Sequence, residues 1–206
     1  ENTYKGIKRI VCKDYEDKIG TAGQFLYDLN CILDARKQNF DVILQLGYTS
    51  SSIWSFLFPK KAIIVTNMDG LEWKRTKYNS MVQKFLLFAE KLAVNHSDYL
   101  ISDSIGIQEY LSKKHKKPSE FIAYGATLFD SYDFNKIQSI VATPFSYDLL
   151  IARMEPENNI EVIIKGYLKK DTGRKLLLVG NYNGTRFGQY LYQKYSINDS
   201  IVFLGS

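Results

Sequence analysis

The feature that most constrains this chain is an alternation of short apolar runs with longer segments whose apolar residues recur at helical spacing. Such alternation requires crossover helices and therefore a mostly parallel sheet. The run DVILQLG is continuously apolar, which is typical of a sheet covered on both faces. The predicted strands cover residues 6–12, 41–47, 61–67, 98–102, 120–125, 147–153, 175–181 and 201–205.

The segments between these strands predict helices. Thr21 and Ser80 stand where N-caps are expected, and Pro59 should end the short helix before it. The predicted helices cover residues 21–36, 51–58, 80–97, 104–115, 157–170 and 185–195.

The order of elements predicts two α/β domains. Residues 1–126 form the first, and residues 127–145 have weak periodicity and are interpreted as a connector with room for a short helix. Residues 146–206 then repeat a β-α-β-α-β pattern, one mononucleotide-binding half of a doubly wound domain. A three-stranded open sheet has an unpaired edge, so we expect the natural protein to continue or another chain to cover it.

Composition excludes several classes of protein. The 206 residues are 45% hydrophobic and 24% charged, which is typical of a globular chain, and no apolar run approaches the roughly 20 residues of a membrane span. The net charge of +5 favours phosphate ligands or an anionic membrane surface, but the basic residues are too dispersed to indicate nucleic-acid binding. Cys12 and Cys31 show no metal-ligand spacing and are interpreted as reduced core residues of a cytoplasmic protein.

Ligands of open parallel sheets bind beyond the carboxyl ends of the strands. This rule locates a site without naming a reaction, and the sequence contains no dinucleotide-binding, P-loop, nucleophile-elbow or zinc signature. Dehydrogenase, NTPase and hydrolase functions are therefore disfavoured. The residues that follow the predicted strands are Gly47, Tyr48, Asn67 to Gly70, Ser102 to Ser104, Tyr124, Gly125, Ala152, Arg153, Gly180, Asn181 and Gly205.

Arg153 is the sharpest single candidate. Its guanidinium follows a predicted strand and precedes a helix that starts with PENN, so it could meet phosphate oxygens bidentately beside the N–H groups of the helix. The alternative, equally weighted, is a surface arginine that pairs with Glu155 or Glu157.

The segment NMDGLEWKR is the second candidate. The Asp69 carboxylate could accept hydrogen bonds from sugar hydroxyls and the Trp73 indole could stack on a sugar, but a turn at Asp69-Gly70 and a packing role for Trp73 are the competing interpretations. Capping of the following helix is the expected role of Ser104. The run Lys113 to Lys117 is interpreted as a solvated helix end, with a membrane surface as the less favoured reading, and His96 and His115 are given no catalytic role.

Several strings carry a family resemblance that covers essentially the whole chain. TNMDGLEWKRTKY, FLLFAEKLAVNHSDYLISDSIGIQEYL, FIAYGA and YDLLIARMEPENNIE resemble bacterial glycosyltransferases of family 4, and among them the rhamnosyltransferase-like members of cell-surface polysaccharide assembly. DGLEWKR and ARMEPENN are the more specific strings. The resemblance implies the GT-B architecture of two Rossmann-like domains, with the acceptor on the N-terminal domain and the nucleotide-sugar donor mainly on the C-terminal one.

The resemblance also implies roles for residues. Arg153 matches the diphosphate-binding arginine of the family, and the lysine that commonly follows it is Asn158 here. Asp69 matches the loop beside the transferred sugar and is expected to be catalytic with Arg153, whereas Ser104 and Gly125 match positions near the interdomain cleft. Gly180 and Asn181, in the string LLLVGN, complete the predicted donor-binding set, and no metal or cofactor is expected because basic side chains and helix dipoles neutralise the leaving diphosphate.

The resemblance predicts a retaining hexosyltransferase that moves rhamnose or a similar sugar from a nucleotide sugar to a lipid-linked or glycan acceptor. We expect it to be cytoplasmic, with peripheral contact to the inner face of the membrane as an option. The first strand with its Gly-rich loop would precede Glu1 and the paired-glutamate donor motif would follow Ser206, so this piece alone is expected to be inactive. The alternatives are a GT-B epimerase or phosphorylase, and a non-catalytic module that binds carbohydrate or a partner.

Overall fold

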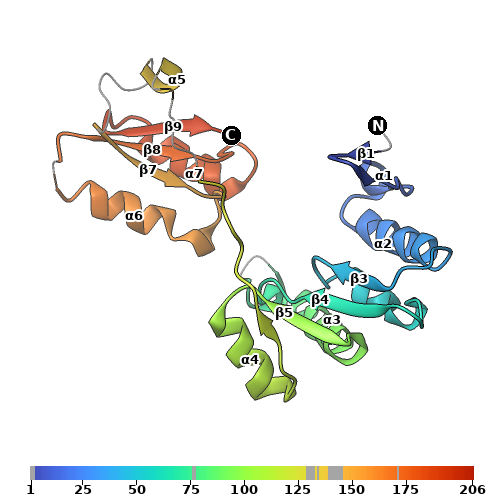
Figure 1. The fold of residues 1–206 in the computed structure, drawn as a ribbon. Helices are drawn as coiled ribbons and strands as arrows, with labels where there is room; N and C mark the ends of the chain where they lie inside the picture. Colours follow the sequence, from blue (N-terminus) through green and yellow to red (C-terminus); the bar gives the residue numbers. More distant parts are fainter. Residues whose placement is uncertain (1–2, 76–77, 129–132, 134, 139–145, 171) are drawn as a thin grey trace. The chain divides into compact units, whose positions relative to one another are not determined.

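The computed structural model describes residues 3–75, 78–128, 133, 135–138, 146–170 and 172–206. The chain divides into two compact units, Glu1–Ala126 and Thr127–Ser206, which are taken one at a time (Figure 1). Most of the predicted connector 127–145 lies outside the described residues, and within it the described element is the short helix α5 (Asn135–Gln138).

The first unit is built on a parallel sheet, as the alternation predicts. Its four strands lie in the order β3-β4-β5-β6, and every neighbouring pair is parallel. The predicted strand 120–125 is reduced to two residues. The strands are β3 (Val42–Gln45), β4 (Ile63–Asn67), β5 (Tyr99–Ser102) and β6 (Glu120–Phe121).

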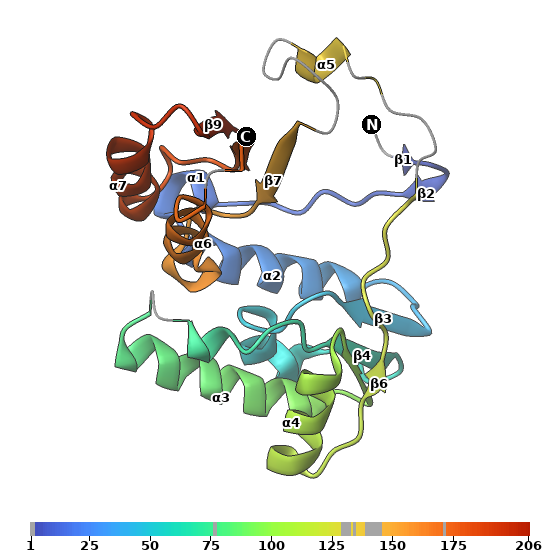
Figure 2. The ribbon, with the colours of Figure 1, turned by 90° about the vertical axis from the view of Figure 1, so that its left-hand side faces the viewer.

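Helices connect these strands and form one layer against the sheet. Figure 2 shows α2 and α3 running side by side, and both contact the 3-10 helix η1, with Phe25 of α2 edge-on to Phe85 of α3. The helical elements are α1 (Glu16–Ile19), α2 (Ala22–Ala35), η1 (Ser51–Leu57), η2 (Glu72–Lys74), α3 (Ser80–His96) and α4 (Ile105–His115).

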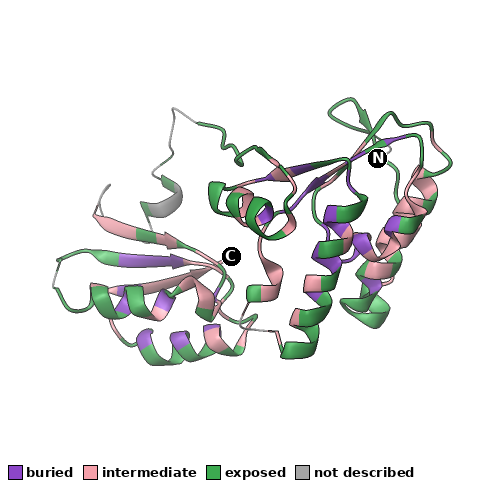
Figure 3. Ribbon diagram, turned by 90° about the horizontal axis from the view of Figure 1, so that it is seen from below, coloured by how far each residue is buried: buried purple, intermediate pink, exposed green. Residues whose placement is uncertain are grey.

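One face of this sheet carries the core. Leu100 packs with Ala89 and Ala93 of α3 and with Leu111 of α4, and Figure 3 shows buried residues gathered on the strands and along the helices. The other face is exposed in the described residues, at Val42, Leu44, Ile63 and Tyr99. The prediction that strand 41–47 is covered on both faces is therefore wrong for this part of the chain. Crossovers of one hand between strands in sequential order place every connecting helix on the same face.

The predicted strand 6–12 does not join the parallel sheet. Its residues Ile7–Lys8 form β2, which pairs antiparallel with β1 (Thr3–Tyr4) in a small hairpin. The turn between them uses Lys5 and Gly6, both at positive φ, so local turn chemistry takes the segment out of the sheet.

Two predicted helix starts also differ. The α3 helix is capped by the Asn79 side chain, which accepts a hydrogen bond from the Val82 N–H at 3.0 Å, and Ser80 is the first helical residue. Thr21 stands at the N-cap of α2 but accepts no side-chain hydrogen bond there. Ser104 caps α4 as predicted, with its Oγ accepting from the Ile107 N–H.

The second unit repeats the same plan with three parallel strands in the order β7-β8-β9. Ile160 and Ile164 of α6 and Leu191 of α7 are fully buried against Leu176 and Leu178 of β8. The elements are β7 (Tyr147–Ile151), η3 (Pro156–Asn158), α6 (Ile160–Tyr167), β8 (Lys175–Val179), α7 (Arg186–Tyr195) and β9 (Ile201–Gly205).

Among the helices of the described residues, none is long and apolar enough to cross a membrane.

Candidate functional site

The carboxyl ends of the first unit's strands bring the predicted loops together. The Tyr48 hydroxyl, beyond β3, donates to the Gly70 carbonyl oxygen beyond β4 at 3.3 Å. The Asn67 side-chain amide at the end of β4 donates to the Tyr124 hydroxyl, beyond β6, at 3.0 Å. Parallel strands end at one rim of the sheet, so three loops far apart in the sequence meet here, as the topological rule predicts.

Asp69 lies at this rim with its side chain exposed. Its φ of 36° is in the left-handed region, which aspartate tolerates better than most residues, and its backbone N–H donates to Asn67 Oδ1 at 3.3 Å. Backbone strain of this kind is concentrated at functional sites, although it also suits the turn that was the competing interpretation. The loop thus presents a carboxylate at the end of a buried strand.

Trp73 and Glu90 join this loop to the helices behind it. The Trp73 Nε1–H donates to Glu90 Oε2 at 3.0 Å, and the indole lies 6.2 Å from the Tyr110 ring. The Lys114 ammonium stands 5.2 Å from the indole centroid. These contacts favour the packing role of Trp73 over stacking on a sugar.

Glu90 is the most buried carboxylate of this cluster, with 1% of its surface exposed. Its Oε1 accepts from the Tyr110 hydroxyl at 2.8 Å, Lys114 Nζ at 2.9 Å and His115 Nε2 at 2.7 Å. Burial acts to raise the pKa of Glu90, but the hydrogen bonds from His115, Lys114 and Tyr110 together hold it below its ordinary value. The local sequence does not mark Glu90 as a site residue, because its partners lie 17 to 25 residues away.

The basic run Lys113 to Lys117 is largely engaged inside the unit. Lys114 and His115 bind Glu90, Lys117 donates to the carbonyl oxygens of Val94 and Ser97, and Lys113 pairs with Glu109 at 3.0 Å. Much of the positive charge of this run is therefore already engaged by ion pairs and hydrogen bonds within the unit, which disfavours the membrane-surface interpretation.

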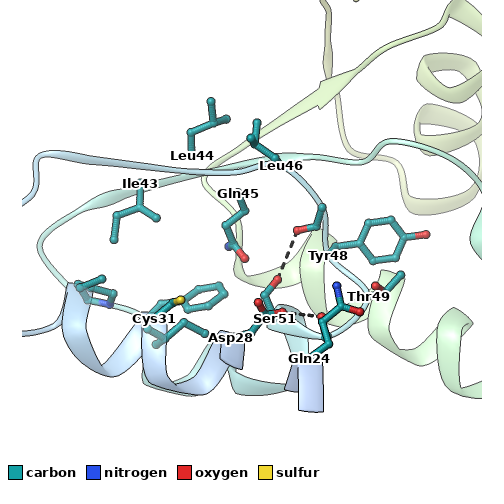
Figure 4. Close-up of a pocket in the computed structure, with 16 residues that line it drawn as sticks. Gln24, Asp28, Cys31, Ile43, Leu44, Gln45, Leu46, Tyr48, Thr49 and Ser51 are labelled. Atoms are coloured by element: carbon teal, nitrogen blue, oxygen red, sulfur yellow. Dashed lines mark hydrogen bonds between the residues drawn. The ribbon is translucent and has the colours of Figure 1, made fainter. Parts of the chain in front are cut away.

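A pocket of about 490 Å³ opens between α2 and β3 (Figure 4). Asp28 of α2 points into it and accepts a hydrogen bond from the Ser50 hydroxyl at 2.5 Å, and burial raises the pKa of Asp28. Gln24 and Gln45 add amide groups, a donor and acceptor set suited to a hydroxyl-bearing ligand. In the sequence, the pocket is marked only by polar residues at helical spacing on α2, such as Gln24 and Asp28.

Arg153 lies at the rim of the second unit, directly beyond β7, and is exposed. No ion pair involves its guanidinium within the residues that the structure describes, so the predicted alternative of pairing with Glu155 or Glu157 is not found there. Its carbonyl oxygen accepts from the Asn158 side chain and from the Glu155 N–H, both at 2.7 Å. Asn158 thus shapes the loop that carries Arg153.

Gly180 and Asn181 occupy the neighbouring loop, beyond β8. The Asn181 Oδ1 accepts from the backbone N–H groups of Asn183 and Gly184, which closes a turn. The Thr185 hydroxyl donates to the Met154 carbonyl oxygen at 2.7 Å and accepts from the Gly188 N–H at 3.0 Å, so one side chain caps α7 and ties the two loops together. Arg153, Asn158, Gly180 and Asn181 therefore share one rim, while Asp69, Ser104 and Gly125 share the rim of the first unit.

In the described part of the chain, no group of three or more His, Cys, Asp or Glu side chains is placed to hold a metal ion.

Comparison with known proteins identifies a family and a fold. The family model described as Domain of unknown function (DUF1972) matches residues 8–127. No curated protein sequence matches the chain.

Similar solved structures include HepE of Anabaena in complex with UDP-glucose, with a TM-score of 0.66 and 14% identity over 97% of this chain and 56% of that chain. HepE in complex with UDP has a TM-score of 0.57 at 14% identity, over 90% of this chain and 53% of that one. MnaA of S. aureus with UDP has a TM-score of 0.56 at 13% identity, over 98% and 55%. The predicted α/β fold of GT-B type is confirmed, and the chain spans about half the length of these structures.

Proposed function

The chain belongs to the family described as Domain of unknown function (DUF1972). We propose that it is part of a retaining glycosyltransferase, which moves a sugar from a nucleotide-sugar donor to an acceptor. Two kinds of support converge on this function. The fold is that of solved structures which carry UDP-glucose or UDP, and the rim of the second unit presents a cation where parallel sheets bind ligands.

The observation that carries the proposal is the Arg153 guanidinium. It is exposed beyond a parallel strand, without an ion pair to the described residues, and its loop is shaped by Asn158 and leads into α6. A guanidinium can hold two oxygens of a diphosphate at once, and helix N–H groups add to the positive potential.

In the proposed reaction, the bond between the sugar and the diphosphate breaks and negative charge grows on the leaving oxygen. Arg153 stabilises this charge in the transition state, which is where such a contact accelerates the reaction. Asn158 occupies the position of a lysine in the resembling family, so Arg153 is the cation of this loop. Neutralisation by protein groups, without a metal, is part of the proposal.

The acceptor side belongs to the first unit in this proposal. The exposed carboxylate of Asp69 would accept hydrogen bonds from the hydroxyls of the transferred sugar or the acceptor. A rhamnosyl or similar hexosyl group, a lipid-linked saccharide acceptor and action at the inner face of the membrane rest on the family resemblance, as do the donor-site roles of Gly180, Asn181, Ser104 and Gly125.

Arg153→Ala tests the proposal, with Arg174→Ala as its matched control. Arg174 is an arginine of the same unit at the start of β8, the opposite rim, where it pairs with Asp148 at 2.9 Å. Titration with UDP and turnover of a nucleotide sugar are measured in the complete enzyme, because this piece alone is expected to be inactive. We expect Arg153→Ala to weaken UDP binding and lower turnover on the order of 10²-fold, and Arg174→Ala to change neither. Equal behaviour of the two variants removes Arg153 from the mechanism.

Product analysis separates the alternatives. Conversion of a nucleotide sugar in the absence of any acceptor indicates an epimerase, and a requirement for inorganic phosphate indicates a phosphorylase. Saturable UDP or carbohydrate binding without any turnover indicates a non-catalytic module.

A further inference from the structure

Glu90 presents a full negative charge in a place where charge is costly. Its side chain is almost completely buried on α3, and four groups donate to its two oxygens. A buried carboxylate is tolerated only when it is paired and hydrogen-bonded, and replacing it with an apolar group is often no less stable. Stability alone therefore does not account for an ion at this position.

The donors to Glu90 come from two other elements. Tyr110, Lys114 and His115 belong to α4, and Trp73 belongs to η2 in the loop beyond β4. The α4 donors all reach Oε1, whereas Trp73 alone reaches Oε2. One oxygen is thus held in place by the helix while the other is presented to the loop.

The loop is held at a second point, at Gly70, which directly follows Asp69. The Tyr48 hydroxyl is buried and donates to the Gly70 carbonyl oxygen. The left-handed backbone of Asp69 lies next to this contact, and Trp73 is four residues further along. The two contacts together determine where the exposed Asp69 carboxylate stands.

We propose that Glu90 is a positioning residue that acts through Trp73 to hold the Asp69–Arg75 loop in the geometry that receives the sugar acceptor. This inference rests on the proposed function, because it takes the loop to be part of the acceptor site. In this proposal, Glu90 contacts no substrate and acts on the acceptor site only through Trp73, which links the helix layer to the loop at the rim.

A spectroscopic experiment tests the loop contact without relying on activity. The chain has two tryptophans, so Trp54→Phe leaves Trp73 as the reporter. In this background, we expect Glu90→Gln to increase acrylamide quenching of Trp73 at least about twofold, because the loop opens. Ser97→Ala is the control for lost stability, since Ser97 at the C-cap of α3 makes buried hydrogen bonds to Thr66 and Ala93 and does not contact Glu90 or Trp73 in the described residues. Unchanged quenching in Glu90→Gln, or an equal increase in Ser97→Ala, overturns the proposal.

A kinetic experiment then tests the consequence for the acceptor. Glu90→Gln should raise the KM for the acceptor and lower kcat, so that kcat/KM for the acceptor falls about tenfold, because a misplaced binding group slows the reaction. UDP binding should be unchanged, because the donor site is not altered. Trp73→Phe removes the N–H link and leaves Glu90 with its α4 partners, so it should reproduce the kinetic change if Glu90→Gln does not fold. Normal acceptor kinetics in both variants overturns the inference. Absence of turnover in the unmodified complete enzyme contradicts the proposed function instead, whereas the quenching result tests the loop contact independently of activity.

Discussion

The backbone at Gly180 lies so close to Ala152 that a Cβ added to Gly180 would come within 2.1 Å of the Ala152 carbonyl oxygen. The Gly180 N–H also donates to the Gly205 carbonyl oxygen at 2.7 Å, which holds the Gly180 backbone in this position. The end of β8 is therefore in close backbone contact with the segment that carries Arg153.

Gly180→Ala should consequently destabilise the second unit by about 2 kcal/mol or more, since the obstacle is backbone rather than a flexible side chain. It should also weaken UDP binding, because the Ala152 to Met154 segment has to move. Urea unfolding and UDP titration measure the two effects. Gly166→Ala is the matched control: its Cβ meets open space in α6, and alanine should stabilise that helix by about 0.5–1 kcal/mol. Equal stability of the two variants contradicts the close approach.

Ser104→Ala should lower the free energy of unfolding by about 1 kcal/mol, because α4 loses its N-cap. Ser112→Ala, at an exposed position in the same helix, should act in the opposite direction by a few tenths of a kcal/mol. Thermal unfolding compares the two variants. A loss of sugar turnover in Ser104→Ala far beyond this destabilisation would add a ligand contact to its capping role.

Glu161 should make the second unit sensitive to acid. Hydrogen bonds from Lys194, Tyr190 and Lys165 lower the pKa of Glu161 from 4.5 to about 2. A carboxyl group with a lowered folded-state pKa stabilises the fold above its unfolded-state pKa, and this stability is lost as the pH falls. We expect Glu161→Gln to lower the melting temperature at pH 6 and to flatten its decline between pH 4.5 and pH 2.

Glu109→Gln provides the control for that pH profile. It removes a carboxylate from an exposed pair with Lys113 at the surface of α4, where little stability is expected. Its melting temperature should follow that of the unmodified protein at every pH. A Glu161→Gln profile that also does so would show that the contacts of Glu161 with Lys194, Tyr190, Lys165 and Tyr195 contribute nothing to stability.

Cys31 should react slowly as a nucleophile. Burial, and to a smaller extent the contact with Cys12, raises the pKa of Cys31 to about 11. Because the thiolate is the reactive form, little of Cys31 is reactive near neutral pH. Alkylation by iodoacetamide at pH 8, followed by peptide mass spectrometry, should be about 100-fold slower at Cys31 in the folded protein than in urea. Equal rates in the two states would contradict the raised pKa.

The sequence was sufficient for the parts of the fold that depend on local pattern. Continuous apolar runs marked the strands of both parallel sheets, and their order predicted the rims where loops gather, as the Tyr48–Gly70 and Asn67–Tyr124 contacts confirm. The segment 6–12 has an apolar strand composition, but the Lys5-Gly6 turn places two of its residues in a hairpin. The composition of a strand does not determine which other strand it pairs with.

The hidden part of the candidate site consists of contacts between distant elements. Nothing near Glu90 in the sequence marks it, since it stands in an apolar helix and looks like an exposed position until Trp73 and His115 are brought to it. Asn79 replaced Ser80 as the cap of α3 because either residue can cap and only the backbone geometry decides between them. The roles assigned to Asp69 and Arg153 stay predictions.

The parallel strands leave each unit with a back rim, where helices return to the starts of strands. The turns at 116–119 and 196–200 lie on these back rims, away from Asp69 and Arg153. A fluorophore, an affinity handle or a surface linker attached there would leave both candidate ligand rims uncovered. Immobilised protein could accordingly be screened for sugar nucleotides on one unit and glycan acceptors on the other.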